Sequence, residues 1–428
     1  MTNSFRYIRR ANTDWWINEK AIVGMNGKTY IGYMTDTGEI HIKELDAKCS
    51  RAESRDVCLT RLNCAYADEH NAPSVCVLRS GRIIVCYTGH NENSALTYRV
   101  TQKPYDILSF GPEKHLSYTR GNATYAQIFE NETRGEVWLF TRVGGVNWEF
   151  RYSPDEGDTW SEPRRIVSSD AGGLFYMNIR KKLIPGKDRT QERFTFALYG
   201  HPYLSRDHII RAGYLESDGT LHLSDGMPLP VNLIDNDILF PIEELSVVYA
   251  SPEGTTVRLL ANAATGPDRV ALCTFTRGDE DSAVYHVATF KDGAWKLSAP
   301  IAKAGAFLAP TQTDGSDSYV PGMDFYFGVG SDGFTYHGGT INTDRIYLAR
   351  KGSDSWLLES YTSRNSGDTY EYESTLRDIP LTAGTKIWRP IVPLYAQDNL
   401  PVYWHEGSYS AHTGGWHCNE VLPVEYDD

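Results

Sequence analysis

Short apolar or alternating runs fill the sequence, and turns rich in Gly, Asp and Asn separate them. Long stretches with an apolar residue at every third or fourth position are almost absent. A period of two favours β-strands, because successive side chains of a strand point to opposite faces of its sheet. The pattern therefore predicts an all-β protein.

One kind of strand recurs at intervals of ~50–70 residues, the length of one four-stranded sheet with its loops. With an N-terminal hairpin at Ala21–Leu45, the repeats give seven units. We predict a seven-bladed β-propeller in which an N-terminal strand completes the last blade, with residues 1–428 forming one domain. The predicted innermost strands are Pro73–Leu78, Tyr125–Phe129, Tyr176–Arg180, Glu244–Tyr249, Gly322–Phe327 and Arg389–Leu394.

Two segments with the pattern S-x-D-x-G-x-T-W support a propeller. Ser153–Trp160 matches this Asp-box (BNR-like) pattern, and Ser363–Tyr370 is a degenerate copy. Such a turn needs a side chain that accepts backbone N–H bonds and a Gly with positive φ. The boxes therefore indicate fold and not chemistry.

Charge and composition narrow the class of partner. Asp and Glu number 55 against 42 Lys and Arg, a net charge of −13, which argues against nucleic acid. No apolar run reaches the ~20 residues of a membrane span. The first residues lack the apolar core of a signal peptide, so we expect a cytosolic chain or a mature secreted one. Seven cysteines are too few for a disulfide-built fold, although one bridge among Cys49, Cys58 and Cys64 is compatible with the sequence.

The ends of propeller strands converge on one face, where a ligand pocket is expected. Histidines, arginines and tyrosines gather at these ends. No zinc-ligand spacing is present, whereas a structural calcium ion in the central channel is compatible with the sequence. The candidate positions are His70, Asn71, His90, Arg99, Tyr125, Arg142, Arg151, Tyr176, His201, Arg211, Asn262, His337, Arg389 and His405.

Two motifs carry a resemblance to a known family. Asp68–Val75 contains D-E-H-N-A-P, and Ser80–Asn91 ends in T-G-H-N. Together with Phe150–Trp160, they make the chain resemble the propeller polysaccharide lyases over nearly its whole length. That group includes ulvan lyases and L-rhamnose-α-1,4-D-glucuronate lyases, and the chain length and the 20-residue interval from His70 to His90 favour the second, fungal type. Glu69 departs from the usual second Asp.

The resemblance implies β-elimination at a 4-linked glucuronate, releasing L-rhamnose from gum arabic or arabinogalactan, without a required cofactor. Such a reaction needs a cation on the carboxylate, a base at C5 and an acid at O4. We assign base and acid to His70, with His90 beside it, and the carboxylate to Arg151 and Asn71. Weaker assignments for sugar binding are Tyr125, His201 and Arg211. We expect a secreted monomer acting on an acidic polysaccharide, with no membrane partner.

Three alternatives remain open from the sequence. The chain could be an ulvan-type endolyase, a propeller α-L-rhamnosidase that hydrolyses the same bond, or a non-catalytic carbohydrate-binding propeller. A hydrolase usually needs a carboxylate pair, and Glu243, Glu244 and Glu406 are the acidic residues near rim positions. A lectin tends to repeat one pocket in each blade. Rim residues of this chain differ from blade to blade, which favours one asymmetric catalytic site.

Overall fold

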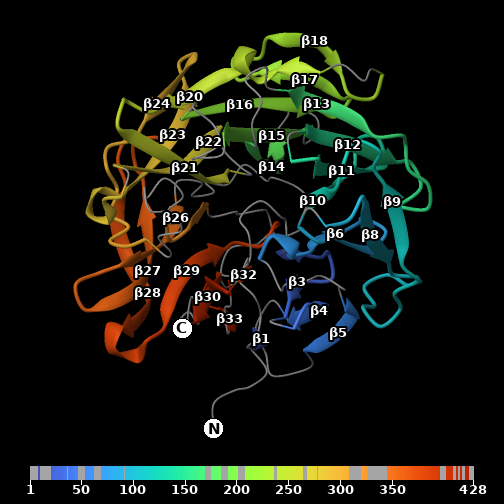
Figure 1. Cartoon of the computed structure of the whole chain (residues 1–428), viewed down its shortest axis with the longest axis horizontal. Coiled ribbons are helices and arrows are strands. Elements are labelled where there is room, and N and C mark those ends of the chain that lie inside the picture. Colours follow the sequence, from blue (N-terminus) through green and yellow to red (C-terminus); the bar gives the residue numbers. More distant parts are fainter. Residues whose placement is uncertain are drawn as a thin grey trace.

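The computed structural model of the chain confirms the all-β propeller class (Figure 1). No helix in the part of the chain that the structure describes is long and apolar enough to cross a membrane. The described residues are 8–9, 21–35, 37–46, 54–61, 69–90, 92–145, 147–168, 175–184, 191–200, 208–235, 239–263, 268–276, 278–307, 320–325, 345–395, 402–407, 411–412, 415–416 and 420–423.

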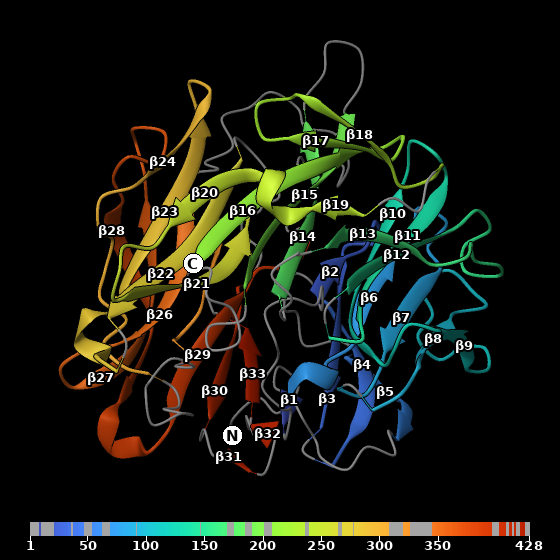
Figure 2. The ribbon, with the colours of Figure 1, turned by 45° about the horizontal axis from the view of Figure 1, so that its top comes forward.

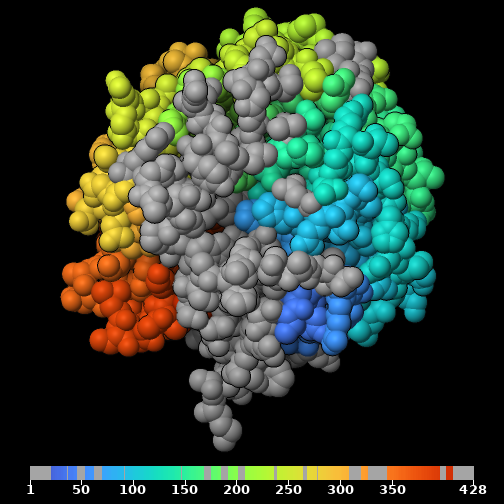
Figure 3. Space-filling view, viewed as in Figure 1, coloured from blue at the N-terminus to red at the C-terminus, as the bar shows by residue number. Residues whose placement is uncertain are grey.

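Within these residues, seven sheets of four to six strands follow one another around a central axis (Figure 1). The innermost strand of each sheet contacts the innermost strand of the next, from β2 through β6, β10, β14, β21 and β25 to β29. Leu394, just after β29, bridges to Ile22 of β2 and closes the circle. In the space-filling view, the blue to cyan residues of the second sheet reach the middle of the face (Figure 3).

Each of these sheets forms one blade, and the blades are numbered in chain order. Blade 1 contains β2 (Ala21–Val23), β3 (Lys28–Met34), β4 (Glu39–Asp46) and β5 (Arg55–Arg61). Blade 2 contains β6 (Ser74–Val77), β7 (Ile83–Tyr87), β8 (Ala95–Val100) and β9 (Lys114–Ser117). Blade 3 contains β10 (Ala123–Asn131), β11 (Glu136–Val143), β12 (Asn147–Ser153), β13 (Arg164–Ser168) and β19 (Phe240–Pro241). Blade 4 contains β14 (Phe175–Ile184), β15 (Gln191–Gly200), β16 (Ile209–Glu216), β17 (Thr220–Leu223), β18 (Pro228–Asn232) and β20 (Ser246–Ala250).

Blade 5 contains β21 (Thr255–Asn262), β22 (Arg269–Thr276), β23 (Val284–Lys291) and β24 (Ala294–Leu297). Blade 6 contains β25 (Met323–Phe325), β26 (Arg345–Lys351), β27 (Ser355–Thr362) and β28 (Glu371–Pro380). Blade 7 contains β29 (Lys386–Ile391), β30 (Tyr403–Gly407), β33 (Glu420–Pro423) and β1 (Ile8–Arg9). A small hairpin of β31 (Ala411–His412) and β32 (Gly415–Trp416) and the 3₁₀ turns η1 (Glu69–Asn71), η2 (Ile242–Glu244), η3 (Glu280–Ser282) and η4 (Leu381–Ala383) complete the described elements.

The two ends of the chain share blade 7. β1 pairs with β33 in antiparallel register, Ile8 opposite Val421, so an N-terminal strand completes the C-terminal sheet as the sequence predicts. The tilted view shows β1 beside β30 and β33 (Figure 2). The pairing gives the last sheet its fourth strand.

Blade 5 differs from the prediction. The sequence pattern predicts Glu244–Tyr249 as its innermost strand, but Ser246–Ala250 forms β20, which pairs with the first half of β16 in blade 4. The innermost strand is β21, whose residues after Thr255 are all buried, whereas β20 is buried only at Val248. An edge strand and an innermost strand share the same short apolar pattern, so burial and not pattern separates them.

Both Asp boxes form the expected turns. In the first, Ser153 Oγ accepts the Gly157 N–H at 2.8 Å, and Asp155 accepts the Thr159 N–H at 2.7 Å. In the second, Ser363 and Asn365 accept the Gly367 and Thr369 N–H groups, both at 2.9 Å. The first box joins the far end of β12 to β13, away from the start of β12 at Asn147.

A buried amide ties blade 3 to blade 4. The Gln127 side chain is fully buried; its Nε2 donates to the Met177 carbonyl at 3.0 Å, and its Oε1 accepts the Ile179 N–H at 2.7 Å. These bonds satisfy two backbone groups of β14 that face another blade. The contact therefore holds two innermost strands that belong to different sheets.

Replacing Gln127 by Leu should cost about 2–4 kcal/mol of unfolding free energy, because both backbone groups of β14 would remain buried without partners. Urea unfolding measures the loss. The matched control Gln191→Leu, at an exposed position of β15, should change stability by less than about 0.5 kcal/mol. Equal losses in the two variants would contradict the role of Gln127.

A buried ionic cluster joins blades 2, 3 and 4. Lys181 Nζ lies 2.6 Å from Glu132 and 2.8 Å from Glu192. Glu130 accepts the Arg79 backbone N–H at 2.8 Å. Burial raises the pKa of Glu130 from its usual 4.5 to about 7, against the opposing effect of Lys181.

Glu130 should make the protein lose stability as the pH rises from 5 to 8. Between pH 4.5 and 7 the folded carboxyl keeps a proton that the unfolded one releases, so its contribution is complete at low pH and is lost through pH 7. Glu130→Gln imitates the protonated form, so its melting temperature relative to wild type should rise over that range. The expected effect is of the order of 1–3 kcal/mol. A difference that does not change with pH would exclude Glu130 as the titrating group.

Candidate functional site

Two histidines stack at one end of blade 2. His70 lies in η1 before β6, and His90 follows β7. In the β6–β7 ladder Ser74 pairs with Cys86, so positions 70 and 90 are opposite each other where the ladder is extended. Their ring centroids are 4.0 Å apart with an interplanar angle of 15°. The structure thus brings the two predicted residues together.

Tyr125 connects this histidine pair to blade 3. Its ring centroid lies 5.7 Å from that of His70 and 6.5 Å from that of His90. Its φ is +63°, in the left-handed region, and the β10–β11 register shifts between Thr124 and Gln127. A bulge re-aims side chains beside functional sites, and this one accompanies a tyrosine ring directed at another blade.

Arg142 is the cation of this cluster. Its guanidinium lies 4.6 Å from the ring centroid of Tyr125 and 5.4 Å from that of Tyr176, between blades 3 and 4. The side chain is only 2% exposed, and its Nε and Nη1 have no hydrogen-bond partner in the described structure. Burying a charge without an ionic or hydrogen-bonding partner is costly, so an anionic ligand would complete its environment.

Aromatic residues continue the cluster on both sides. Trp148 stacks on Tyr125 at 6.2 Å and an angle of 9°. Tyr176 lies 5.5 Å from Tyr199, whose hydroxyl accepts a bond from Arg258 Nη1 at 3.1 Å. The cluster therefore spans blades 2 to 5.

The remaining predicted binding residues have different positions. Asn71 is 1% exposed and follows His70 in η1, which contacts β10. Arg211 lies on β16, opposite Leu198 of β15, and is buried. His201 lies outside the described residues. The roles of these three in sugar binding stay predictions.

Arg151 is not placed with the histidines. Its Nη1 and Nη2 donate to the carbonyls of Ser161 at 2.8 Å and Ser117 at 2.5 Å, and its guanidinium lies 4.9 Å from the Tyr118 ring. Because β12 begins at Asn147, Arg151 is four residues, about 13 Å, from the strand's start. These bonds engage the Arg151 guanidinium between blades 2 and 3, and its assignment to the carboxylate stays a prediction.

The register of β11 and β12 places Arg142 and Arg151 at different levels of blade 3. Both arginines lie near strand ends, but Arg142 pairs across β11–β12 with Trp148, next to the start of the strand. The sequence does point to Arg142, because it is one of the candidate residues at strand ends. Only the register separates it from Arg151, which pairs with Leu139 deeper in the blade.

The central channel contains an internal ion pair. Arg180 of blade 4 lies 3.7 Å from Asp324 of blade 6, which also accepts the Val392 N–H of blade 7 at 3.0 Å. Among the described residues no group of three His, Cys, Asp or Glu side chains could hold a metal ion. The calcium ion compatible with the sequence stays an untested prediction.

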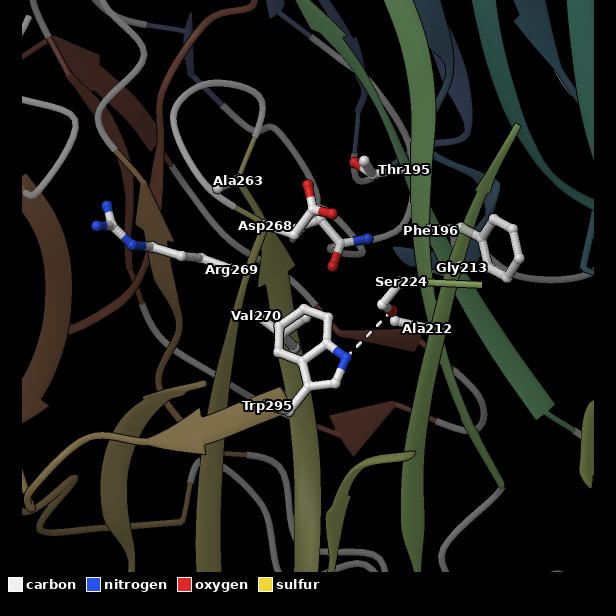
Figure 4. A pocket seen from close by; sticks show the side chains of 11 residues that line it. Thr195, Phe196, Ala212, Gly213, Ser224, Ala263, Asp268, Arg269, Val270 and Trp295 are labelled. Carbon is white, nitrogen blue, oxygen red and sulfur yellow. Dashed lines mark hydrogen bonds between the residues drawn. The ribbon is translucent and has the colours of Figure 1, made fainter. Parts of the chain in front are cut away.

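A small recess lies between blades 4 and 5, apart from the histidine pair (Figure 4). Trp295 Nε1 donates to Ser224 Oγ at 3.1 Å across its wall. Asn262 bonds the Asn178 carbonyl at 2.6 Å, and Asp268 pairs with Lys182. Four of its polar side chains are thus engaged within the protein, and the recess is a weaker candidate than the Arg142 cluster.

Comparisons with known proteins agree with the propeller fold. A sequence profile described as "BNR repeat-containing family member" matches residues 28–182. An ulvan lyase, described as a new family of polysaccharide lyase, superposes with a TM-score of 0.68 at 13% identity, over 98% of this chain and 94% of that one. A structure of such a lyase bound to -[GlcA(1-4)Rha3S]- gives the same TM-score and identity over 98% and 95% of the two chains. A search of curated sequences finds no significant match. At this identity the likeness establishes a shared fold.

Replacement by uncharged Met should affect the melting temperature differently at Arg142 and at Arg151. Arg142→Met removes a buried cation that has no ionic partner among the described residues and keeps an apolar side chain, so the melting temperature should stay at or above the wild-type value. Arg151→Met removes two bonds from a buried guanidinium to backbone carbonyls and should lower it by several degrees. Calorimetry of both variants decides this. A larger loss for Arg142→Met would show that Arg142 is a structural residue.

Proposed function

We propose that the protein is a polysaccharide lyase that cleaves the bond to O4 of a glucuronate by β-elimination. The observation that carries the proposal is the buried guanidinium of Arg142, whose Nε and Nη1 have no partner in the described structure, beside Tyr125 and the stacked histidines. A uronate carboxylate has the charge and planar shape that arginine binds through two parallel bonds.

Arg142 would supply the electrostatic part of catalysis. Removing the weakly acidic C5 proton places negative charge on the carboxylate, and a fixed cation stabilises that charge as it develops. The two tyrosine rings that contact the guanidinium restrict its motion, so little reorganisation is needed during the reaction.

The histidine pair would supply the proton transfers. Neutral His70 takes the C5 proton, the C4–C5 double bond forms, and the C4–O4 bond breaks with its electron pair on O4. The imidazolium then protonates O4, so one residue serves as base and acid when both groups lie on one face of the sugar. His90, 4.0 Å away, holds the first ring by stacking.

For the substrate we propose the terminal L-rhamnose-α-1,4-D-glucuronate unit of gum arabic or a related arabinogalactan, acted on by a secreted monomer. The ligand of the similar lyase structure, -[GlcA(1-4)Rha3S]-, also combines a GlcA unit with a Rha-type unit, Rha3S, and its printed linkage runs from GlcA to Rha3S. Tyr125, Arg142 and Tyr176 are each more than nine-tenths buried. Such a confined site suits the end of a polysaccharide chain better than its middle.

A hydrolytic mechanism has less support. Of the acidic residues near the rim, Glu406 accepts two bonds from Arg377 and one from Trp404 Nε1. These bonds engage both carboxylate oxygens of Glu406 within blades 6 and 7. A general acid or base for glycoside hydrolysis needs instead a carboxyl group that faces the substrate.

Incubation with gum arabic and with ulvan tests the proposal. Elimination should release free L-rhamnose from gum arabic together with near-ultraviolet absorbance from the new double bond, whereas a hydrolase releases sugar without absorbance. Absorbance with ulvan and no free sugar would identify an endolyase. The proposal would be overturned if neither polymer gave free sugar or near-ultraviolet absorbance.

Variants then connect the reaction to the site. His70→Asn should lower turnover by about 10²–10⁴-fold, the usual contribution of one acid–base group. Arg142→Met should also lose most activity while Arg151→Lys keeps more, provided that each variant is folded. Activity should decline at acid pH, because a protonated imidazole cannot act as base.

A further inference from the structure

The orientation of Tyr125 depends on more than its own strand. Left-handed φ costs a non-glycine residue about 1 kcal/mol or more, and it persists only when surrounding contacts determine it. The bulge interrupts the β10–β11 pairing at this point, so the local ladder contributes less than elsewhere. Side-chain contacts must therefore fix the ring.

Trp148 has the geometry to provide that contact. It is completely buried at the start of β12 and lies opposite Arg142 in the β11–β12 register. Its ring is nearly parallel to that of Tyr125, at 6.2 Å and 9°, and its Nε1 donates to the Phe175 carbonyl of blade 4 at 3.3 Å. The indole is thus fixed to the backbone next to Tyr176 and packs along the Tyr125 ring.

We propose that Trp148 is a positioning residue that holds the Tyr125 ring against the His70–His90 pair. It acts on the reaction through Tyr125 and touches no reacting atom. The indole supplies a flat surface for the ring and, through its bond to Phe175, a fixed distance between blades 3 and 4. The kinetic part of this inference rests on the proposed lyase function, and the structural part does not.

Trp138 provides a matched comparison within the same blade. It is also completely buried, and its Nε1 donates to Glu136 at 3.0 Å. Its ring packs against Phe150 at 5.1 Å and Phe194 at 4.6 Å, in the hydrophobic core between blades 3 and 4. Loss of either tryptophan removes core volume, but only Trp148 stacks on Tyr125.

The experiment compares Trp148→Leu, Trp148→Phe and Trp138→Leu in the full chain labelled with ¹⁵N-histidine. The imidazole resonances of His70 and His90 are assigned by their loss in His70→Asn and His90→Asn. Because the Tyr125 ring lies close to both imidazoles, any displacement of that ring changes their shifts. Melting temperatures and kcat and KM on gum arabic are measured for the same samples.

We expect Trp148→Leu to move both histidine resonances and to lower kcat by about 10–100-fold, with KM changed much less. Trp148→Phe, which keeps a ring, should leave the histidine resonances and kcat close to their wild-type values. Trp138→Leu should lower the melting temperature but leave the histidine resonances and kcat unchanged. Unmoved resonances in Trp148→Leu, or equal changes in Trp138→Leu, would overturn the inference. Should the wild type catalyse no elimination, the proposed function fails, while the resonances still decide the role of Trp148.

Discussion

The site depends on one backbone conformation, the left-handed φ of Tyr125. At this residue the innermost strand of blade 3 departs from regular pairing, and the tyrosine ring turns toward three neighbours on different elements. His70 lies on one side, Arg142 on another and Trp148 along its face. A regular strand would direct side chains alternately across the sheet and would not bring these groups together.

The cost of the arrangement is spread over the blades. Arg142 is buried with no ionic partner in the described part of the chain, and Tyr125 occupies a sparsely populated conformation. The Gln127 amide, two residues from Tyr125, ties the same stretch of β10 to β14 of the next blade. A rigid ring of sheets is suited to this task, since strained groups persist only when the surrounding structure fixes them.

The sequence predicts the fold well and part of the geometry of the candidate site. Strand period, repeat length and the Ser153 and Ser363 boxes specify a propeller, because they depend on local chemistry that each blade repeats. The approach of His70 to His90 follows from hairpin geometry alone. Which of Arg142 and Arg151 lies beside the histidine pair depends instead on where β12 begins. The pairing of β20 depends on which sheet has a free edge. Neither leaves a local trace in the residue pattern.

The pairing of Ile8 with Val421 imposes an order on how the molecule comes into being. At ~5–20 residues per second, the ribosome needs about 20–80 s to supply the 413 positions that separate the two partners. Blades 2 to 4, which hold the histidines, Tyr125 and Arg142, are complete well before that time. The first strand therefore waits as an unpaired edge through most of synthesis, and the ring closes only after the residues of the site have emerged.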